Sequence, residues 1–416
     1  MWVGGLVLDA RTAEGWKVVA GGVLINLMLG VTYTWSVFAG PLAENFGWSQ
    51  TQVQLAFSVM LAAFAFSMIP AGMLIDRRGP KAVALAGGLL LAAGFVATGL
   101  FATTPLLLYV TYGLIAGAGV GLAYGTPISA GMKWFEKGKG LVSGIIVFGF
   151  GFGSLLLAPI AKELIVTQGI QQAFLTLGIV FAAVVSLGAM LLKNPPEYKP
   201  AAPASGLAVF GILKKREFWI LWAMFALSSA AGLMVIGNLA TFAKLSFATT
   251  HGMAADDAFS LAALAVGVLA VFNGAGRIFA GWLSDKIGRA KTMLLMFGIQ
   301  AVAVASIVLA GSVSPWLLFA VMCVVGLCFG ANFSLFPAAT ADYFGTKNSG
   351  VNYGLVFTAY GIGGIVGPQL MAVMLDAARA STGGLAVDAY TIPFLAAGAM
   401  VAIAALASQI GKPAAA

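Results

Sequence analysis

Residues 271–288 read VFNGAGRIFAGWLSDKIG, an apolar stretch that contains one arginine and ends in a polar turn. The turn, GWLSDKIGRAK at 281–291, echoes an earlier one, GMLIDRRGPK at 72–81. At one offset of 209 positions, the matching pairs are Gly72 and Gly281, Asp76 and Asp285, and Gly79 and Gly288. A repeat at half of a 416-residue chain predicts two structurally related halves.

The composition predicts a membrane protein. Hydrophobic residues make up 61% of the chain and charged residues only 9%, against about 25% charged in soluble domains. Apolar runs of about 20 residues, long enough to cross a bilayer as helices, recur along the chain. The twelve predicted spans are 17–39, 53–75, 82–102, 106–131, 140–161, 170–192, 217–243, 256–283, 291–311, 316–341, 350–373 and 389–411. The expected fold is therefore an all-α membrane protein.

One long polar interruption divides these spans. Residues 193–216, KNPPEYKPAAPASGLAVFGILKKR, are rich in proline and basic residues and follow the sixth span. They predict a cytoplasmic linker between an N-terminal six-helix bundle, 1–192, and a C-terminal six-helix bundle, 217–416.

The net charge of +8 reflects topology and gives no indication of a nucleic-acid partner. Most of the 22 Lys and Arg fall in the loops between spans 2–3, 4–5, 6–7, 8–9 and 10–11, or at their helix edges. Lys162, Lys244 and Arg379 fall in the loops on the other side of the membrane. The positive-inside rule then places both termini in the cytoplasm, in a cell (inner or plasma) membrane. The N-terminal residues show no cleavage site, so no removable signal peptide is expected. Cys323 and Cys328 are interpreted as packing residues.

Arg277 lies inside the predicted eighth span. A guanidinium stays charged, and placing it mid-membrane costs at least about 2.5–3.5 kcal/mol on insertion scales, which makes it a functional candidate. The alternative is an arginine bound to helix carbonyls or reaching the cytoplasmic surface near Asp285. No carboxylate falls in the middle of a predicted span. The hypothesis is that the balancing anion is the transported molecule, since arginine can donate two parallel hydrogen bonds to a carboxylate.

Other polar and aromatic residues are predicted to complete a substrate site. Asn273 lies one turn before Arg277 and is placed to orient it or a substrate oxygen. Tyrosines offer a ring with a hydroxyl, and phenylalanines an apolar wall. The predicted aromatic contacts are Tyr33, Tyr124, Phe333, Phe336, Phe357 and Tyr360. For each of them alone, ordinary packing is the competing interpretation.

The doubled loop motif, with twelve spans, resembles the signature of the major facilitator superfamily over essentially the whole chain. The resemblance implies two six-helix bundles around a central cavity that alternate access. It also implies a cytoplasmic gating motif, in which acidic and basic side chains pair with one another and with helix ends. The residues assigned to it are Asp76, Arg77, Arg78, Asp285, Lys286 and Arg289.

Within that superfamily the chain is most similar to monocarboxylate transporters and bacterial oxalate:formate antiporters. The likeness is carried by EGWKVVAGG (14–22), WFEKGKGLVSG (134–144), FNGAGRIFAGWLSDKIGR (272–289) and NYGLVF (352–357). Both groups have a functional arginine that falls on Arg277. The lysine of the oxalate carriers falls on Tyr360, which favours a monoanion. An aspartate common in monocarboxylate carriers is replaced by Asn273, so proton coupling is implied by the resemblance without an identified proton acceptor.

The leading expectation is secondary active transport of small monocarboxylates such as lactate or pyruvate, with a proton. The alternatives are a carboxylate exchanger of the oxalate:formate kind and a receptor or assembly subunit that does not transport. The expected partners are a small carboxylate anion, a proton and the lipid bilayer. An enzyme is disfavoured because the one histidine, His251, lies in a predicted loop and no metal-ligand cluster is present in the sequence. No cofactor is expected.

Overall fold

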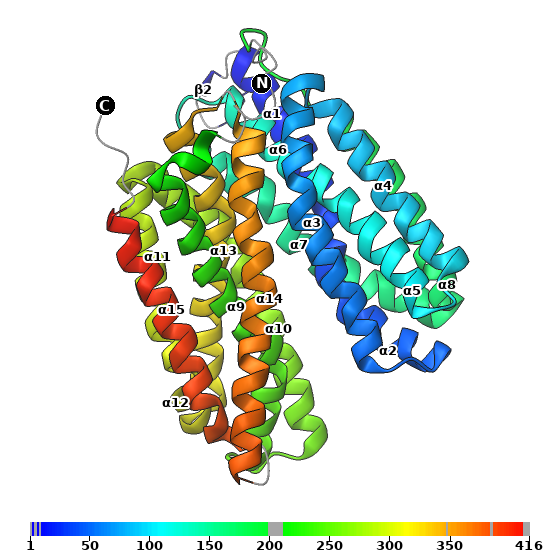
Figure 1. Cartoon of the computed structure of the whole chain (residues 1–416), viewed down its shortest axis with the longest axis vertical. Coiled ribbons are helices and arrows are strands. Elements are labelled where there is room, and N and C mark those ends of the chain that lie inside the picture. The colour runs from blue at the N-terminus through cyan, green and yellow to red at the C-terminus, as the bar shows by residue number, and fades with distance from the viewer. Residues whose placement is uncertain are drawn as a thin grey trace. The chain divides into compact units, whose positions relative to one another are not determined.

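A computed structural model describes residues 2–3, 6–7, 10–198, 211–346, 348–382 and 386–410. The chain divides into two compact units. Unit 1 comprises Met1–Ile212 with Pro337–Thr358, and unit 2 comprises Leu213–Phe336 with Ala359–Ala416. Nearly all the described residues are helical, which confirms the all-α prediction (Figure 1). The described strands, β1 (Trp2–Val3) and β2 (Leu6–Val7), are two residues long and form one hairpin.

Unit 1 is built mainly from the first six spans. Its helices are α1 (Ala10–Leu29), η1 (Gly30–Thr34), α2 (Trp35–Phe46), α3 (Gln50–Arg78), α4 (Pro80–Phe101), α5 (Pro105–Leu108), η2 (Tyr109–Ala116), α6 (Gly117–Trp134), α7 (Lys139–Gln168) and α8 (Ile170–Met190). The segment 337–358 adds the end of α13 and the start of α14 to this unit. Residues 199–210 of the predicted linker lie outside the described residues.

Unit 2 contains the later spans. Its helices are α9 (Arg216–Thr249), α10 (Ala255–Ile287), α11 (Arg289–Ala305), α12 (Ile307–Val313), α13 (Pro315–Phe344), α14 (Ser349–Thr382), η4 (Val387–Tyr390) and α15 (Thr391–Ile410), with 337–358 of α13 and α14 assigned to unit 1.

Among the described residues, eleven helices are long and apolar enough to cross a membrane. The predicted ninth span is divided into α11 and α12, which meet at an angle of 51°. Counted as one span, this pair brings the number of candidate spans to twelve. The bend falls at Ser306, whose hydroxyl donates to the carbonyl of Ala303 at 2.9 Å. Such a bond back to the preceding turn competes with the helical ladder and bends helices.

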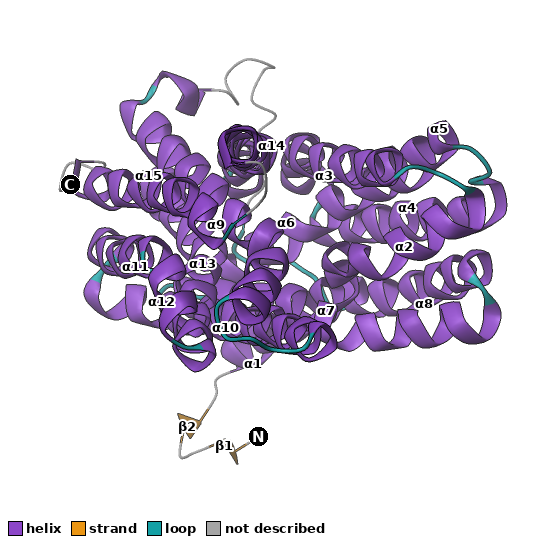
Figure 2. Cartoon of the chain, turned by 90° about the horizontal axis from the view of Figure 1, so that it is seen from below, coloured by secondary structure: helices purple, strands orange, loops and turns teal. Residues whose placement is uncertain are grey.

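The two units pack their outer helices in the same way. In unit 1, α4 lies along α8, and in unit 2, α11 lies along α15 (Figure 2). These are the third and sixth spans of each half, as the internal repeat predicts. Large apolar side chains stay exposed on the outer surfaces, for example Leu309 and Leu406 at 67% each. Exposed apolar bands of this kind suit a lipid environment.

The backbone conformation explains why the loop motif repeats a glycine at its end. Gly79 ends α3 and Gly288 ends α10, with φ of 79° and 89°. Side chains other than glycine rarely adopt that region. Each glycine donates its N–H to the last turn, to Ile75 and Ser284 respectively, and the next helix begins at the following residue. The motif therefore sets a sharp turn between successive spans.

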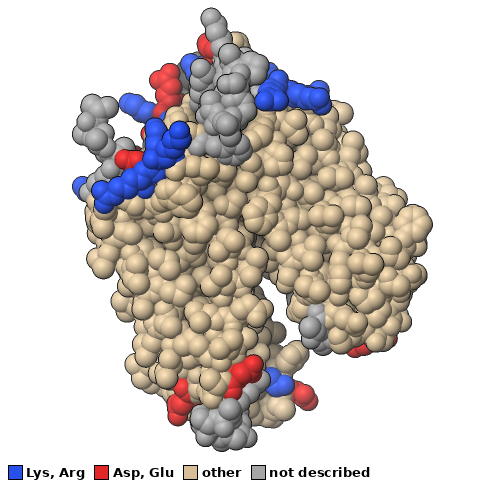
Figure 3. All heavy atoms as spheres, in the orientation of Figure 1, with Lys and Arg blue, Asp and Glu red and all other residues tan. Residues whose placement is uncertain are grey.

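Charged side chains collect at the ends of the helices. Figure 3 shows Lys, Arg, Asp and Glu at the helix ends, and on the face shown the described flanks of each unit are uncharged. Arg77 and Arg78 form the last turn of α3, and Lys286 lies in the last turn of α10. This distribution is expected of helices that cross a hydrocarbon layer.

Candidate functional site

The packing of α10 against α13 positions the arginine of the eighth span. A Cβ added to Gly276 would overlap the carbonyl oxygen of Leu327, and one added to Gly330 would overlap the carbonyl oxygen of Asn273. The two backbones therefore touch directly at this crossing, as small residues permit in membrane helices. This contact brings Arg277, the residue after Gly276, against the aromatic side chains of α13.

The Arg277 side chain is completely buried. Its Nε and Nη2 donate to the side-chain oxygen of Asn273 at 3.2 and 2.9 Å. Asn273 lies one turn towards the beginning of α10, so the guanidinium points away from the Asp285 end of the helix. Arg277 therefore does not reach the cytoplasmic surface near Asp285.

An aromatic group surrounds the guanidinium. Its central carbon lies 4.4 Å from the ring centroid of Phe333, a cation–π distance. The Phe333 ring meets that of Tyr360 edge-on, with centroids 5.4 Å apart. Phe225 of α9 stacks on Phe336 at 4.2 Å and lies 6.1 Å from Tyr360. Three predicted contacts, Asn273, Phe333 and Tyr360, thus lie beside Arg277 or one ring away from it, and Phe336 is joined to them through Phe225.

The remaining predicted aromatics belong to unit 1, where they also form one cluster. Phe150 of α7 meets Tyr33 and Tyr124 edge-on, with ring centroids 5.0 and 5.2 Å apart. Phe64 of α3 lies 5.2 Å from Tyr124 and 5.1 Å from Phe357. Tyr124 and Phe357 are buried, whereas Tyr33 is half-buried.

The eight residues predicted for substrate binding therefore fall into two groups. Unit 2 holds five of them: Arg277, Asn273, Phe333, Phe336 and Tyr360. Unit 1 holds three: Tyr33, Tyr124 and Phe357. Sequence reasoning did not assign Phe64, Phe150 and Phe225, whose rings join the members of each group. In an apolar span, the sequence does not distinguish a phenylalanine that faces the protein interior from one that faces lipid.

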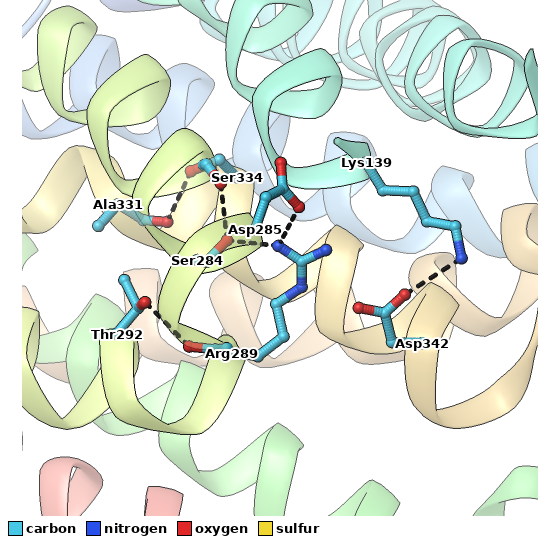
Figure 4. Close-up of polar contacts among 10 residues, drawn as sticks. Lys139, Ser284, Asp285, Arg289, Thr292, Ala331, Ser334 and Asp342 are labelled. Atoms are coloured by element: carbon cyan, nitrogen blue, oxygen red, sulfur yellow. Dashed lines mark hydrogen bonds and ion pairs between the residues drawn. The ribbon is translucent and has the colours of Figure 1, made fainter. Parts of the chain in front are cut away.

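The second copy of the loop motif makes local ion pairs. Arg289 contacts the Asp285 carboxylate at 2.7 Å and donates to the Ser284 hydroxyl (Figure 4). Lys286 lies over the ring of Trp282 at 4.4 Å. In the first copy, Arg77 and Arg78 are exposed, and the side chain of Asp76 lies outside the described part of the chain.

Two further polar contacts in unit 1 join the segment 337–358 to the N-terminal helices. Lys139, at the start of α7, contacts Asp342 of α13 at 3.2 Å (Figure 4). Ser129 of α6 and Ser349 of α14 share a buried hydroxyl–hydroxyl bond of 2.6 Å. The residues in both pairs are more than 200 positions apart, so sequence spacing could not have paired them.

Comparison with known proteins identifies the family. The sequence profile of the Major Facilitator Superfamily matches residues 21–368. The chain belongs to the major facilitator superfamily. Its members are transport proteins, and the apolar helices described above are those of a multi-pass transporter of this superfamily.

Several relatives in the superfamily carry a transport name. The oxalate:formate antiporter of Oxalobacter formigenes is 30% identical over 364 residues, which cover 86% of this chain and 84% of the relative. Monocarboxylate transporter 11 of Mus musculus is 29% identical, with 87% of this chain and 81% of the relative covered. Apicoplast pyruvate carrier 1 of Toxoplasma gondii is 26% identical, with coverage of 83% and 81%.

Solved structures agree with the superfamily fold. The transporter FucP in its outward conformation superposes with a TM-score of 0.72 at 16% identity, covering 95% of this chain and 99% of FucP. The proton:xylose symporter XylE gives a TM-score of 0.67 at 15% identity, with 95% of each chain covered. At these identities the comparison shows the fold alone.

Proposed function

We propose that this transporter carries small monocarboxylates of the lactate and pyruvate type together with a proton. The observation that carries the proposal is the buried Arg277, held by Asn273 and covered by Phe333. A permanent cation in the interior of a membrane bundle is costly, and such residues usually mark a functional site. The planar fork of its N–H groups matches the geometry of a carboxylate.

The surroundings of Arg277 favour a small amphipathic anion. Phe333 and Tyr360 add apolar ring surface beside the cation, and Tyr360 adds a hydroxyl. A molecule such as lactate has a carboxylate at one end and a methyl group with a short polar group at the other. One carboxylate beside one guanidinium leaves that pair with no net charge, which lowers the cost of keeping the bound anion out of water. The names of the transporter and carrier relatives support the same substrate class.

The alternative is exchange of carboxylates across the membrane. It is favoured by the 30% identity to an oxalate:formate antiporter over most of both chains. In that mechanism the site takes an anion on each side, and no proton is needed. The two mechanisms share the role of Arg277 and differ in whether transport requires an anion on the far side.

Uptake of labelled lactate by proteoliposomes tests the function. The wild type is expected to accumulate lactate when the outside is more acidic than the lumen. Arg277→Ala should abolish accumulation, and Arg277→Lys should restore only a small part because the bidentate geometry is lost. Lys162→Ala, which changes an exposed basic residue of α7, is the matched control and should transport normally. Normal lactate flux through a correctly inserted Arg277→Ala protein would refute the proposal.

The requirement for an anion on the far side of the membrane distinguishes exchange from symport. Empty liposomes with an inward proton gradient should accumulate lactate if the mechanism is symport. Flux only into liposomes preloaded with formate or lactate would establish exchange. Tyr360→Lys adds a second cation beside the aromatic group of unit 2, and should shift preference from lactate towards oxalate.

A further inference from the structure

Three polar side chains are fully buried inside unit 2, on three different helices. They are Ser229 of α9, Gln300 of α11 and Asn332 of α13, each with 0% exposure. The Ser229 hydroxyl, both amide atoms of Gln300 and the amide nitrogen of Asn332 have no hydrogen-bonding partner among the described residues. Buried polar groups nearly always have a partner, in the protein or in ordered water, so these atoms need an explanation.

An aromatic stack shows that the three side chains lie at one level. Phe336 of α13 stacks on Phe225 of α9, with centroids 4.2 Å apart, and on Phe297 of α11 at 6.1 Å. Ser229 follows Phe225 by four residues, and Gln300 follows Phe297 by three. Asn332 precedes Phe336 by four residues, and α13 is antiparallel to α9 and α11. Each polar residue is therefore about 4.5–6 Å from the stack, in the same direction along the bundle.

The same spacing sets the direction in which they face. Residues three or four apart share one face of a helix. Since Phe297 and Phe336 face each other, Gln300 and Asn332 lie on the same faces of α11 and α13 one turn farther on, whereas Ser229 lies where α9 meets α14, its Cβ close to Gly363. The neighbouring residue of α9 reaches Asn332 directly: the Ser228 hydroxyl donates to the side-chain oxygen of Asn332 at 3.0 Å. With either orientation of that amide, the other amide atom still lacks a protein partner.

The chemistry of these atoms points to water. We propose that unit 2 binds one or more ordered water molecules between Ser229, Gln300 and Asn332. Gln300 offers a donor and an acceptor, Asn332 offers donors, and Ser229 offers either. A water molecule both donates and accepts, and buried waters typically bind about three polar groups. A metal cation would meet the Asn332 donors, and a carboxylate would find no charged group among these three residues.

The water site has a consequence for the buried charge. Phe333, next to Asn332, is the ring that covers the Arg277 guanidinium. Bound water dipoles at this level make the interior of unit 2 more polarisable than a purely apolar core. The water site itself does not depend on which substrate is transported, so it can be tested separately from the proposed function.

A high-resolution electron cryomicroscopy map of the full chain provides the direct test. The expected result is a density peak within hydrogen-bonding distance of the Asn332 amide and of Ser229 or Gln300. The proposal is overturned if ordered waters are visible elsewhere in the bundle but no peak lies here. It is also overturned if the three side chains bond directly to one another.

Leucine variants test the same site in solution. If water joins the three groups, Asn332→Leu and Gln300→Leu each leave the others unsatisfied, and each should lower the melting temperature by a few degrees. The double variant should lose less than the two losses added together, because both act on one network. Asn238→Leu is the control, since that amide donates within its own helix to Met234. Single variants that melt at or above the wild-type temperature would contradict the proposal.

Discussion

The side-chain oxygen of Asn273 accepts hydrogen bonds from both the Nε and the Nη2 of Arg277, at 3.2 and 2.9 Å. The two residues are four positions apart on α10, and both are buried. Two converging bonds fix the plane of the guanidinium as well as its position. The cation is therefore preorganised, and an incoming anion does not have to order it.

Replacing Asn273 by aspartate should inhibit transport. The ionised carboxylate would pair with Arg277 and compete with the substrate anion. Because an adjacent cation favours the charged form of a carboxylate, this competition should persist at mildly acidic pH. We expect lactate uptake to fall well below that of Asn273→Ala both at pH 7.5 and at pH 5. Equal uptake in the two variants would show that the added carboxylate does not reach the cation.

Removing the ring of Phe333 should weaken substrate binding without unfolding the protein. A cation–π contact contributes about 0.5–2 kcal/mol, and Phe333→Leu keeps an apolar side chain of similar volume. Without the ring the guanidinium is less well held, so KM for lactate should rise by about 2- to 30-fold. Phe333→Trp should retain near-normal KM if it is accommodated. Initial rates of uptake against lactate concentration provide the measurement, and an unchanged KM in Phe333→Leu would rule out a contribution of the ring.

A methyl group at Gly330 should disrupt the crossing of α10 and α13. The added Cβ would overlap the carbonyl oxygen of Asn273, so the helices must separate, at a cost of about 1–3 kcal/mol. The melting temperature in detergent should fall by several degrees. Gly267→Ala, also in a transmembrane helix of unit 2, is the matched control because its Cβ would meet nothing within 4 Å. That substitution should be neutral or slightly stabilising. Equal melting temperatures for the two variants would mean that α10 and α13 do not touch at Gly330.

Reversing the charges of Lys139 and Asp342 should reveal their pairing. Both side chains are partly exposed, at 22% and 33%, so the ion pair contributes at most about 1 kcal/mol. Lys139→Asp and Asp342→Lys should each lower the melting temperature slightly, and the double reversal should recover most of the loss. The coupling should weaken as salt is raised. Purely additive losses would show that the two residues do not interact.

Much of the fold was predictable from sequence. The low charge content and the repeated apolar runs predicted a helical membrane protein. The two halves that the duplicated loop motif suggests, 1–192 and 217–416, stay a prediction, because unit 1 also takes in 337–358. The exceptions are local. The ninth span bends by 51° at Ser306, whose hydroxyl bonds back to Ala303. Hydropathy averages over a window and does not register a single side-chain bond of this kind.

The candidate site was predictable only in part. Arg277 and Asn273 stood out because a charge and an amide are rare in an apolar span, and their spacing of four placed them on one face. Phe64, Phe150 and Phe225 carry no such signal, yet their rings join the predicted aromatics. Which ring faces the interior depends on how each helix is rotated against its neighbours. The sequence of a single segment does not determine that rotation.

The sequence by itself determined which segments are helices that cross a membrane, since the need to satisfy backbone hydrogen bonds in lipid applies to each segment separately. It also determined that one span carries a permanent cation. Only the tertiary structure decided that this cation turns back towards Asn273 and lies on Phe333, and that Lys139 meets Asp342. Those contacts join residues 4 to 203 positions apart, and the longer ones form only when helices from distant parts of the chain pack together.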